Sequence, residues 1–217
     1  MLNLLTFDAT ETAVTLSVVA ILLAFVLMLI IGKKKNSLTS KKITVIALSV
    51  SLTTTLSFIK FSLPFGGSIT LFSLVPVILV SYYYGVYLGA LTGLITGLLQ
   101  FITSPYLLTP LTFALDYVLA FSAVCMASIF KKAINNKTVS LLLGASSFYL
   151  LRYLMHFLAG MIYFSFGYVY DGFPASNAVI YSLCYNLVYL LPDFIISLVF
   201  LLPFSRTKTF KNNLLIS

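Results

Sequence analysis

Seven long apolar runs follow one another along this chain, and they constrain its fold more than any other feature. The runs lie approximately at 12–32, 43–61, 68–84, 86–104, 110–130, 138–165 and 177–203. A helix needs about 20 mainly apolar residues to cross a bilayer. Only 8% of the residues are charged, and the mean hydropathy is +1.08. The sequence therefore predicts an all-α integral membrane protein with no separate soluble domain.

The first run, 12–32, is predicted to be a retained helix rather than a signal peptide. It is longer than the apolar core of a signal, basic residues follow it, and no A-x-A-like cleavage site is evident. We therefore expect two regions. Residues 1–42 would form an N-terminal transmembrane helix with a basic cytoplasmic linker, and residues 43–217 would form the main membrane domain.

The positive charges lie at the ends of the apolar runs. Lys and Arg cluster at 33–42, 131–137 and 206–211 in a chain of net charge +8. This distribution is typical of the cytoplasmic side of a membrane protein, and it argues against nucleic-acid binding. It predicts a cell-membrane, multi-pass protein with basic loops and C-terminus in the cytoplasm. Lys60 is the exception, since it falls near the outer end of its run.

A stripe of glycines occupies the run at 86–104 and the residue before it. Its members are Gly85, Gly89, Gly93 and Gly97. A spacing of four keeps them on one slowly turning helix face, where small residues allow neighbouring helices to approach closely. A phosphate-binding loop is excluded because no G-K-[ST] follows. The shorter row Ala47, Ser51 and Thr55 would pack either within the fold or against another subunit.

Three polar side chains on different predicted helices fall at one depth. Asp116, His156 and Asn186 lie roughly 9–15 Å below the outer surface, by a rise of 1.5 Å per residue. Tyr117 adjoins the first, and Tyr181 lies above the last. Ionisable groups at this depth are costly and usually functional. Two interpretations remain open: a binding site for a cationic or amine-bearing ligand, or a salt bridge from Asp116 to Arg152 or His156.

Arg152 and Asp193 fall near the middle of the bilayer. Arg152 is one helical turn deeper than His156, and Asp193 lies at a similar depth in the last run. Matched depth predicts that they form a structural ion pair, which would leave Asp116 and His156 for the ligand. The aromatic loop at 164–177 would either cover a flat ligand or lie at the interface.

No catalytic or metal-binding set is evident. The chain has one histidine, and Cys125 and Cys184 have the spacing of neither a metal site nor a disulfide framework. No Ser-His-Asp order is compelling, and no ATPase motif is present. We expect neither a cofactor nor a metal, and no enzymatic activity. Energy for any uphill transport would come from a partner or an ion gradient.

Four stretches carry a resemblance to a known family. They are GGSITLFSLVPVILVSYYYGVYLGALTGLITGLLQF (66–101), ALDYVLAF (114–121), LRYLMHFLAG (151–160) and VIYSLCYNLVYLLP (179–192). Together, and in this order, they resemble the thiamine-specific substrate-binding (S) component of energy-coupling factor (ECF) transporters, over about 43–203. The resemblance implies a six-transmembrane-helix core that binds thiamine near its outer face, here preceded by one extra N-terminal helix. It also implies a membrane coupling protein and two ABC-type ATPases as partners.

The resemblance also implies the site residues. The family's acidic residue falls on Asp116, its histidine on His156, its tyrosine on Tyr181 and its asparagine on Asn186. Tyr117 follows the acidic residue, and Gln100 stands at a polar pocket position. This chain has no tryptophan, so Tyr170 of the outer loop would replace the tryptophan on which some members stack the ligand. The surface that docks the coupling protein would correspond to Ala47 and Ser51.

The leading hypothesis is a thiamine-binding transport subunit that needs an ATPase module. One alternative keeps the fold and changes the ligand to a thiamine precursor or another small vitamin. Another is a stand-alone, proton-coupled thiamine carrier, with Asp116 and His156 as proton sites. A membrane protein with a purely structural role would instead pair its polar groups with one another.

Overall fold

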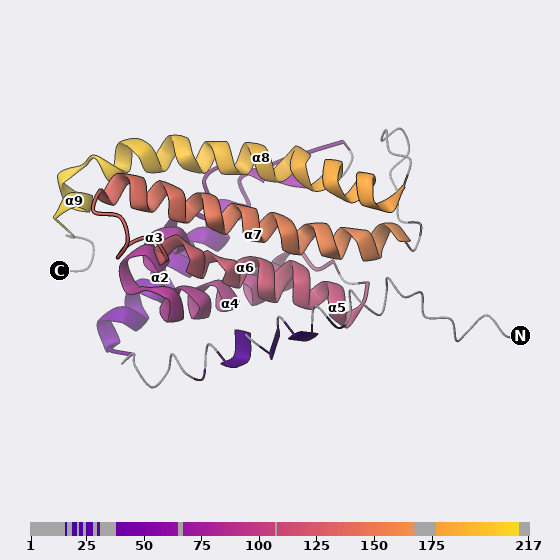
Figure 1. Cartoon of the computed structure of the whole chain (residues 1–217), viewed down its shortest axis with the longest axis horizontal. Helices are drawn as coiled ribbons and strands as arrows, with labels where there is room; N and C mark the ends of the chain where they lie inside the picture. Colours follow the sequence, from indigo (N-terminus) through magenta and orange to yellow (C-terminus); the bar gives the residue numbers. More distant parts are fainter. Residues whose placement is uncertain are drawn as a thin grey trace, which may run out of the picture.

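The computed structural model describes residues 38–64, 67–106, 108–165, 167 and 177–212, with scattered positions between 16 and 30. The predicted helix at 12–32 therefore lies largely outside the described residues. From residue 38 onwards the helices run alongside one another in a bundle, with α7 and α8 side by side (Figure 1). In order, the elements are α2 (Ser40–Ser57), β1 (Lys60–Ser62), β2 (Ser68–Thr70), α3 (Val75–Tyr84), α4 (Val86–Thr103), α5 (Pro110–Phe113), η1 (Ala114–Leu119), α6 (Ala120–Ser122), η2 (Ala123–Ser128), α7 (Lys137–Ser165), α8 (Ala178–Ser205) and α9 (Lys208–Lys211).

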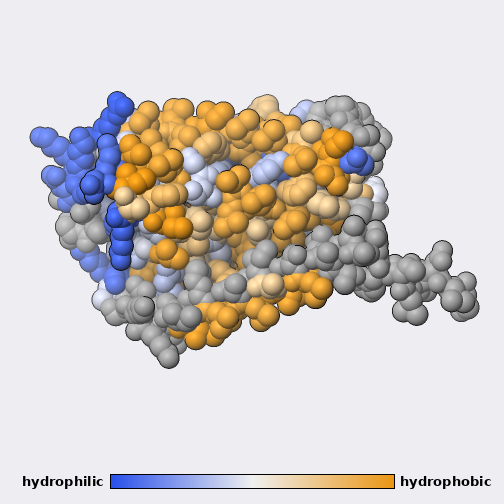
Figure 2. Space-filling view, viewed as in Figure 1, coloured by the Kyte–Doolittle hydropathy of each residue, from blue (hydrophilic) through white to orange (hydrophobic). Residues whose placement is uncertain are grey.

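Four helical segments of the described chain are long and apolar enough to cross a membrane. They are Val86–Thr103, Pro110–Ser128, Lys137–Phe164 and Ala178–Ser205, and α3 is a shorter apolar helix. Apolar side chains also cover the flanks of the bundle (Figure 2). The prediction of a helical membrane protein is confirmed, whereas the predicted number of seven spanning helices is not established.

The second and third predicted spans have different ends from those expected. Helix α2 stops at Ser57, and β1 and β2 form an antiparallel hairpin in which Lys60 pairs with Thr70. Gly67, at a φ of +70°, lies in the turn between the strands, where glycine adopts a left-handed conformation without steric cost. Hydropathy alone does not separate strands of three residues at the edges of apolar runs from the ends of helices, so the hairpin was not predicted.

Three glycines of the stripe make the predicted close helix contact. A Cβ atom added at Gly93 or Gly97 would collide with the backbone between Tyr117 and Ser122. One added at Gly89 would collide with the Ser81 side chain of α3 and lie close to the Cys125 Cα. These contacts bring α4 against the helical segment that carries Asp116. Gly85 has another role. It ends α3 at a φ of +90°, with no atom near its missing Cβ, so it shapes the turn into α4.

One end of the bundle is basic and is closed by α9. Hydrophilic surface is concentrated at this end (Figure 2). The Lys131 Nζ donates a hydrogen bond to the Tyr83 carbonyl at 2.9 Å, and the Lys137 Nζ donates to the Lys211 carbonyl at 2.7 Å. Phe210 of α9 is fully buried beside the Tyr82 ring. The lysine ammonium groups therefore cap the carbonyl groups at helix ends. The partial negative charge of these carbonyl groups favours positive charge at this end of the bundle.

Candidate functional site

A cavity of about 740 Å³ opens in the half of the bundle away from α9. Residues from α2, the hairpin, α4, η1, α6, α7 and α8 line it. They include Lys60, Thr70, Gln100, Asp116, Tyr117, Phe121, Arg152, His156, Gly160, Tyr163, Phe164, Tyr185, Asn186, Tyr189 and Asp193. The lining combines aromatic rings with a few charged groups, which is the composition of a site for a small organic molecule.

Asp116 and His156 form a hydrogen-bonded pair in this cavity. The Asp116 Oδ1 lies 2.7 Å from the His156 Nδ1, and the two side chains are 15% and 11% exposed. Of the partners considered for Asp116, the structure selects His156. The Nε2 atom of His156 is buried and has no hydrogen-bond partner among the described residues. With a proton on Nδ1, Nε2 is free to accept a hydrogen bond.

A turn of π-helix presents Asp116 and Tyr117. The segment η1 (Ala114–Leu119) interrupts an otherwise continuous helical stretch with wider turns. Such turns are rare, and they occur often at functional sites because they turn side chains away from the regular helical direction. The sequence does not reveal this distortion, since no proline or glycine marks it.

Asn186 links α8 to α7 beside the Asp116–His156 pair. Its Nδ2 donates to the carbonyls of His156 at 3.1 Å and Ser182 at 2.9 Å. Its Oδ1 accepts from the Tyr189 hydroxyl at 2.8 Å, and the Tyr189 ring lies edge-on to the imidazole. Gly160 permits this contact, because a Cβ atom there would clash with Ser182 and touch Asn186. The amide is therefore held rigidly at the cavity wall.

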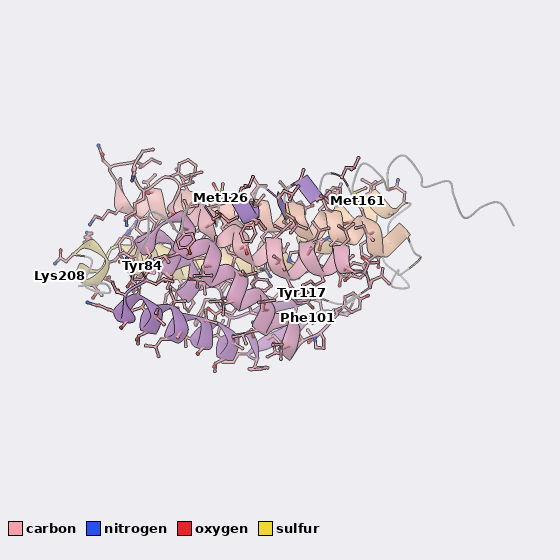
Figure 3. All side chains as sticks on the ribbon, turned by 90° about the horizontal axis from the view of Figure 1, so that it is seen from below. Tyr84, Phe101, Tyr117, Met126, Met161 and Lys208 are labelled. Atoms are coloured by element: carbon pink, nitrogen blue, oxygen red, sulfur yellow. The ribbon has the colours of Figure 1, made fainter. Side chains whose placement is uncertain are left out.

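Tyr117 and Gln100 both line the cavity. The Tyr117 hydroxyl donates to the Ser104 carbonyl at 2.9 Å and accepts from the Tyr106 amide at 3.0 Å. Its ring packs edge-on against Phe101 (Figure 3). The Gln100 Nε2 donates to the Ser57 Oγ at 2.9 Å. Tyr117 thus holds the loop after α4 in place and offers its ring to the cavity.

Tyr181 lies behind the cavity wall rather than in it. It is 3% exposed, and its ring contacts Phe164 at 4.1 Å and Tyr185 at 6.2 Å between centroids. Phe164 and Tyr185 are the residues that line the cavity here. Sequence reasoning included Phe164 only as the first residue of the aromatic loop at 164–177. It missed Tyr185, although Tyr181, Tyr185 and Tyr189 recur at a helical spacing of four. Tyr170 lies outside the described residues.

The predicted ion pair between Arg152 and Asp193 is wrong. Within the described chain, no carboxylate oxygen lies within 4.0 Å of the Arg152 guanidinium. The Asp193 Oδ1 instead accepts hydrogen bonds from the backbone amide and the hydroxyl of Thr70, each at 2.8 Å. The guanidinium carbon of Arg152 lies 4.1 Å from the centre of the Phe121 ring. The unpredicted hairpin supplied the competing donors.

Replacing Asp193 tests this attachment of the hairpin. Asp193→Ala is expected to lower the free energy of unfolding by about 2–3 kcal/mol, because two hydrogen bonds to a charged acceptor are lost. Asp193→Asn keeps an oxygen acceptor, so its loss should be clearly smaller. Thermal unfolding in detergent measures both. Equal losses in the two variants would mean that the charge, rather than the bonds to Thr70, stabilises the protein.

The fold and the cavity define a membrane protein that binds a small solute within a helical bundle. The structure resembles that of ThiT from Listeria monocytogenes, with a TM-score of 0.65 at 22% identity, covering 81% of this chain and 96% of the other. It also resembles the S component of a bacterial ECF transporter, with a TM-score of 0.52 at 22% identity over 82% and 98%. The fold is therefore that of an ECF S component.

Sequence comparison identifies the family. The family model for the thiamine transporter protein matches residues 43–212. The thiamine transporter ThiT of Bacillus subtilis (strain 168) is 34% identical over 150 residues, which cover 64% of this chain and 76% of the relative. The chain belongs to the thiamine transporter family, which confirms the resemblance seen in its motifs.

Proposed function

We propose that this protein is the substrate-binding subunit of an ECF transporter and captures thiamine from outside the cell for ATP-driven uptake. The observation that carries the proposal is the Asp116–His156 pair in a cavity of small-molecule size. The thiazolium ring of thiamine is a permanent cation, and a carboxylate in a partly desolvated site attracts it strongly. His156 lines the same cavity, and its Nε2 has no hydrogen-bond partner among the described residues.

The aromatic lining supports a flat, cationic ligand. Tyr163, Phe164, Tyr185 and Tyr189 all border the cavity. Their faces carry partial negative charge and attract a cationic ring, while their area removes the ligand from water. These rings are the best candidates in the described chain for the stacking role first assigned to Tyr170.

The distribution of charge supports the orientation. The basic end with α9 would face the cytoplasm, and the cavity, in the other half of the bundle, would open to the outside. Residues 43–217 would form the binding domain, and residues 1–42 would add one helix and a basic linker. The energy would come from two ABC-type ATPases acting through a membrane coupling protein.

The small residues of α2 support a docking surface for the coupling protein. Ala47, Ser51 and Thr55 are all exposed and lie on one helix face. Small residues allow a partner helix to approach closely. We expect Ser51→Leu to abolish uptake by the complete transporter while thiamine binding to the isolated subunit stays unchanged. Leu150→Phe enlarges an exposed apolar position on a different helix, α7, and should spare both. Uptake assays with equal subunit expression check this, and normal uptake by Ser51→Leu would contradict it.

Calorimetric titration of the detergent-solubilised protein with thiamine tests the proposal. Calorimetry suits this chain because it has no tryptophan to report binding by fluorescence. We expect one-to-one binding. No binding by a folded sample would overturn the assigned ligand, and titration with the separate pyrimidine half of the vitamin would then test a precursor.

A second candidate, a proton-coupled carrier, is favoured by one observation: the Asp116–His156 pair joins two titratable groups inside the cavity. Uptake measurements on vesicles that contain the protein but no ATPases distinguish the two candidate functions. Uptake driven by a pH gradient alone would favour the carrier, and uptake that requires the ATPase module would favour the subunit.

A further inference from the structure

An apolar groove of about 460 Å³ lies between α2, α3 and α8, apart from the ligand cavity. One wall is a single face of α2, which carries Val45, Ser49, Leu52 and Leu56. Leu52 is 51% exposed, and Phe200, which lines the groove from α8, is 38% exposed. The groove is therefore open along the flank of the bundle, where lipid surrounds a membrane protein.

The groove begins at the basic end of the bundle. Its lining includes Phe204, whose ring centroid lies 6.0 Å from that of Phe210 in α9. Arg206 follows Phe204 by two residues and is exposed. Lys41, also exposed, lies one helical turn before Val45 on the same face of α2. Two cations on different helices therefore flank the end of an apolar groove.

The length of the groove matches one leaflet of a bilayer. Val45 and Leu56, the first and last of its residues on α2, are about 16 Å apart along the helix at a rise of 1.5 Å per residue. On α3 the lining reaches Tyr84, which lies at the same end of the molecule as Lys208 (Figure 3). The hydrocarbon core of a bilayer is about 30 Å thick, so one leaflet takes up about 15 Å. An acyl chain of the leaflet at the basic end therefore fits along α2.

The charge at this end matches an anionic head group. The acidic side chains of the described residues are Asp116 and Asp193, and both border the ligand cavity in the other half of the bundle. Guanidinium and ammonium groups form strong hydrogen bonds with phosphate oxygens. Lys and Arg near a membrane surface also attract anionic lipids. A molecule with an apolar chain and an anionic phosphate group therefore suits both parts of the groove.

The groove is separate from the docking surface proposed on α2. At 100° per residue, the face that lines the groove is turned by about 130° from the face that carries Ala47, Ser51 and Thr55. A lipid in the groove therefore leaves the docking surface exposed. A partner helix on that surface, conversely, does not fill the groove.

We propose that this groove binds one anionic phospholipid, with an acyl chain along α2 and the phosphate group at Lys41 and Arg206. The lipid fills the space between α2 and the neighbouring helices α3 and α8, and it belongs to the leaflet at the basic end. This second binding site does not depend on thiamine or on its cavity.

Native mass spectrometry of the detergent-solubilised full chain tests the proposal with two lipids that share their acyl chains. Dioleoyl phosphatidylglycerol is anionic, whereas dioleoyl phosphatidylcholine has no net charge. We expect one phosphatidylglycerol molecule per protein, bound about 25-fold more tightly than phosphatidylcholine, from the usual contribution of two cations near an anionic head group. The double variant Lys41→Gln/Arg206→Gln should lose this preference. Lys60→Gln is the matched control, since it removes a cation from the hairpin instead, and it should keep the preference.

Filling the groove tests where the acyl chain lies. Ser49→Phe adds a ring inside the groove and should weaken the binding of both lipids by about 10-fold or more, because the displaced CH₂ groups lose their burial. Leu52→Phe fills the same groove from a half-exposed position and replaces Ser49→Phe if that variant does not fold. Leu150→Phe adds volume at an exposed position of α7 and should change neither affinity.

Two results would overturn the proposal. One is equal affinity of wild type for the two lipids, or a preference that survives in the double variant. The other is unchanged phosphatidylglycerol binding by Ser49→Phe. If that variant bound the lipid normally but failed to assemble with the coupling protein, the groove would be a protein interface rather than a lipid site.

Discussion

Asp116→Asn is expected to weaken thiamine binding by about 100-fold or more while the protein remains folded. The substitution keeps an oxygen that accepts from the His156 Nδ1, now 2.7 Å from Asp116, so the contact between η1 and α7 persists. It removes the negative charge that faces the thiazolium cation. A charged interaction in a partly desolvated site is worth about 3 kcal/mol, which corresponds to about two orders of magnitude in affinity. Calorimetric titration and thermal unfolding of one preparation measure both properties.

Asp193→Asn is the matched control for this result. Asp193 is the other carboxylate among the residues that border the cavity, and Thr70 already occupies its Oδ1. Its neutralisation should change thiamine affinity much less than that of Asp116. Equal losses in the two variants would show that the overall charge of the cavity matters rather than one carboxylate. If the Asp116→Asn protein unfolded, the role of the pair between Asp116 and His156 would be structural rather than in ligand binding.

Gly97→Leu is expected to have the largest effect on stability. A Cβ atom at Gly97 would collide with the carbonyl oxygen of Tyr117, which belongs to the π-helical turn. Backbone atoms cannot retreat as a flexible side chain can, so α4 and η1 would have to separate. Overpacking of this kind costs about 3 kcal/mol or more. Because Asp116 lies in the same turn, thiamine affinity should fall together with the unfolding temperature.

Ile95→Phe is the control for added volume on α4. Ile95 is 38% exposed on the outer side of the same helix, so a larger side chain there has room. Its unfolding temperature should stay close to that of wild type. Both variants are compared by thermal unfolding in detergent. A Gly97→Leu protein as stable as the Ile95→Phe protein would contradict the close packing of α4 against η1.

The two largest predicted effects meet at one place in the fold. Gly97 allows α4 to approach the turn that carries Asp116, and His156 binds that turn from α7. A π-helical turn is less favourable than an α-helical one and persists only where its surroundings stabilise it. The glycine stripe, which is a packing feature in the sequence, therefore also positions the binding carboxylate.

The sequence by itself determined the class of protein and the depth of the site along the helices. Hydropathy and the positions of lysine and arginine are properties of each segment alone, so they predicted a helical membrane protein with one basic end. The depth of a residue in the membrane also follows from the sequence, by counting residues from the end of its helix. That count was enough to bring Asp116, His156 and Asn186 to one level. In the structure the His156 side chain bonds Asp116 and the His156 carbonyl accepts from Asn186.

Only the tertiary structure decided which groups become partners. Equal depth did not make Arg152 the partner of Asp193, because Thr70 of the two-stranded hairpin donates hydrogen bonds to that carboxylate instead. Depth also did not put Tyr181 in the cavity, since Phe164, which contacts the Tyr181 ring, and Tyr185 line the cavity instead. Partner choice depends on how each helix is rotated about its axis and on loops that hydropathy does not describe. Both are set by packing between segments, which no single segment encodes.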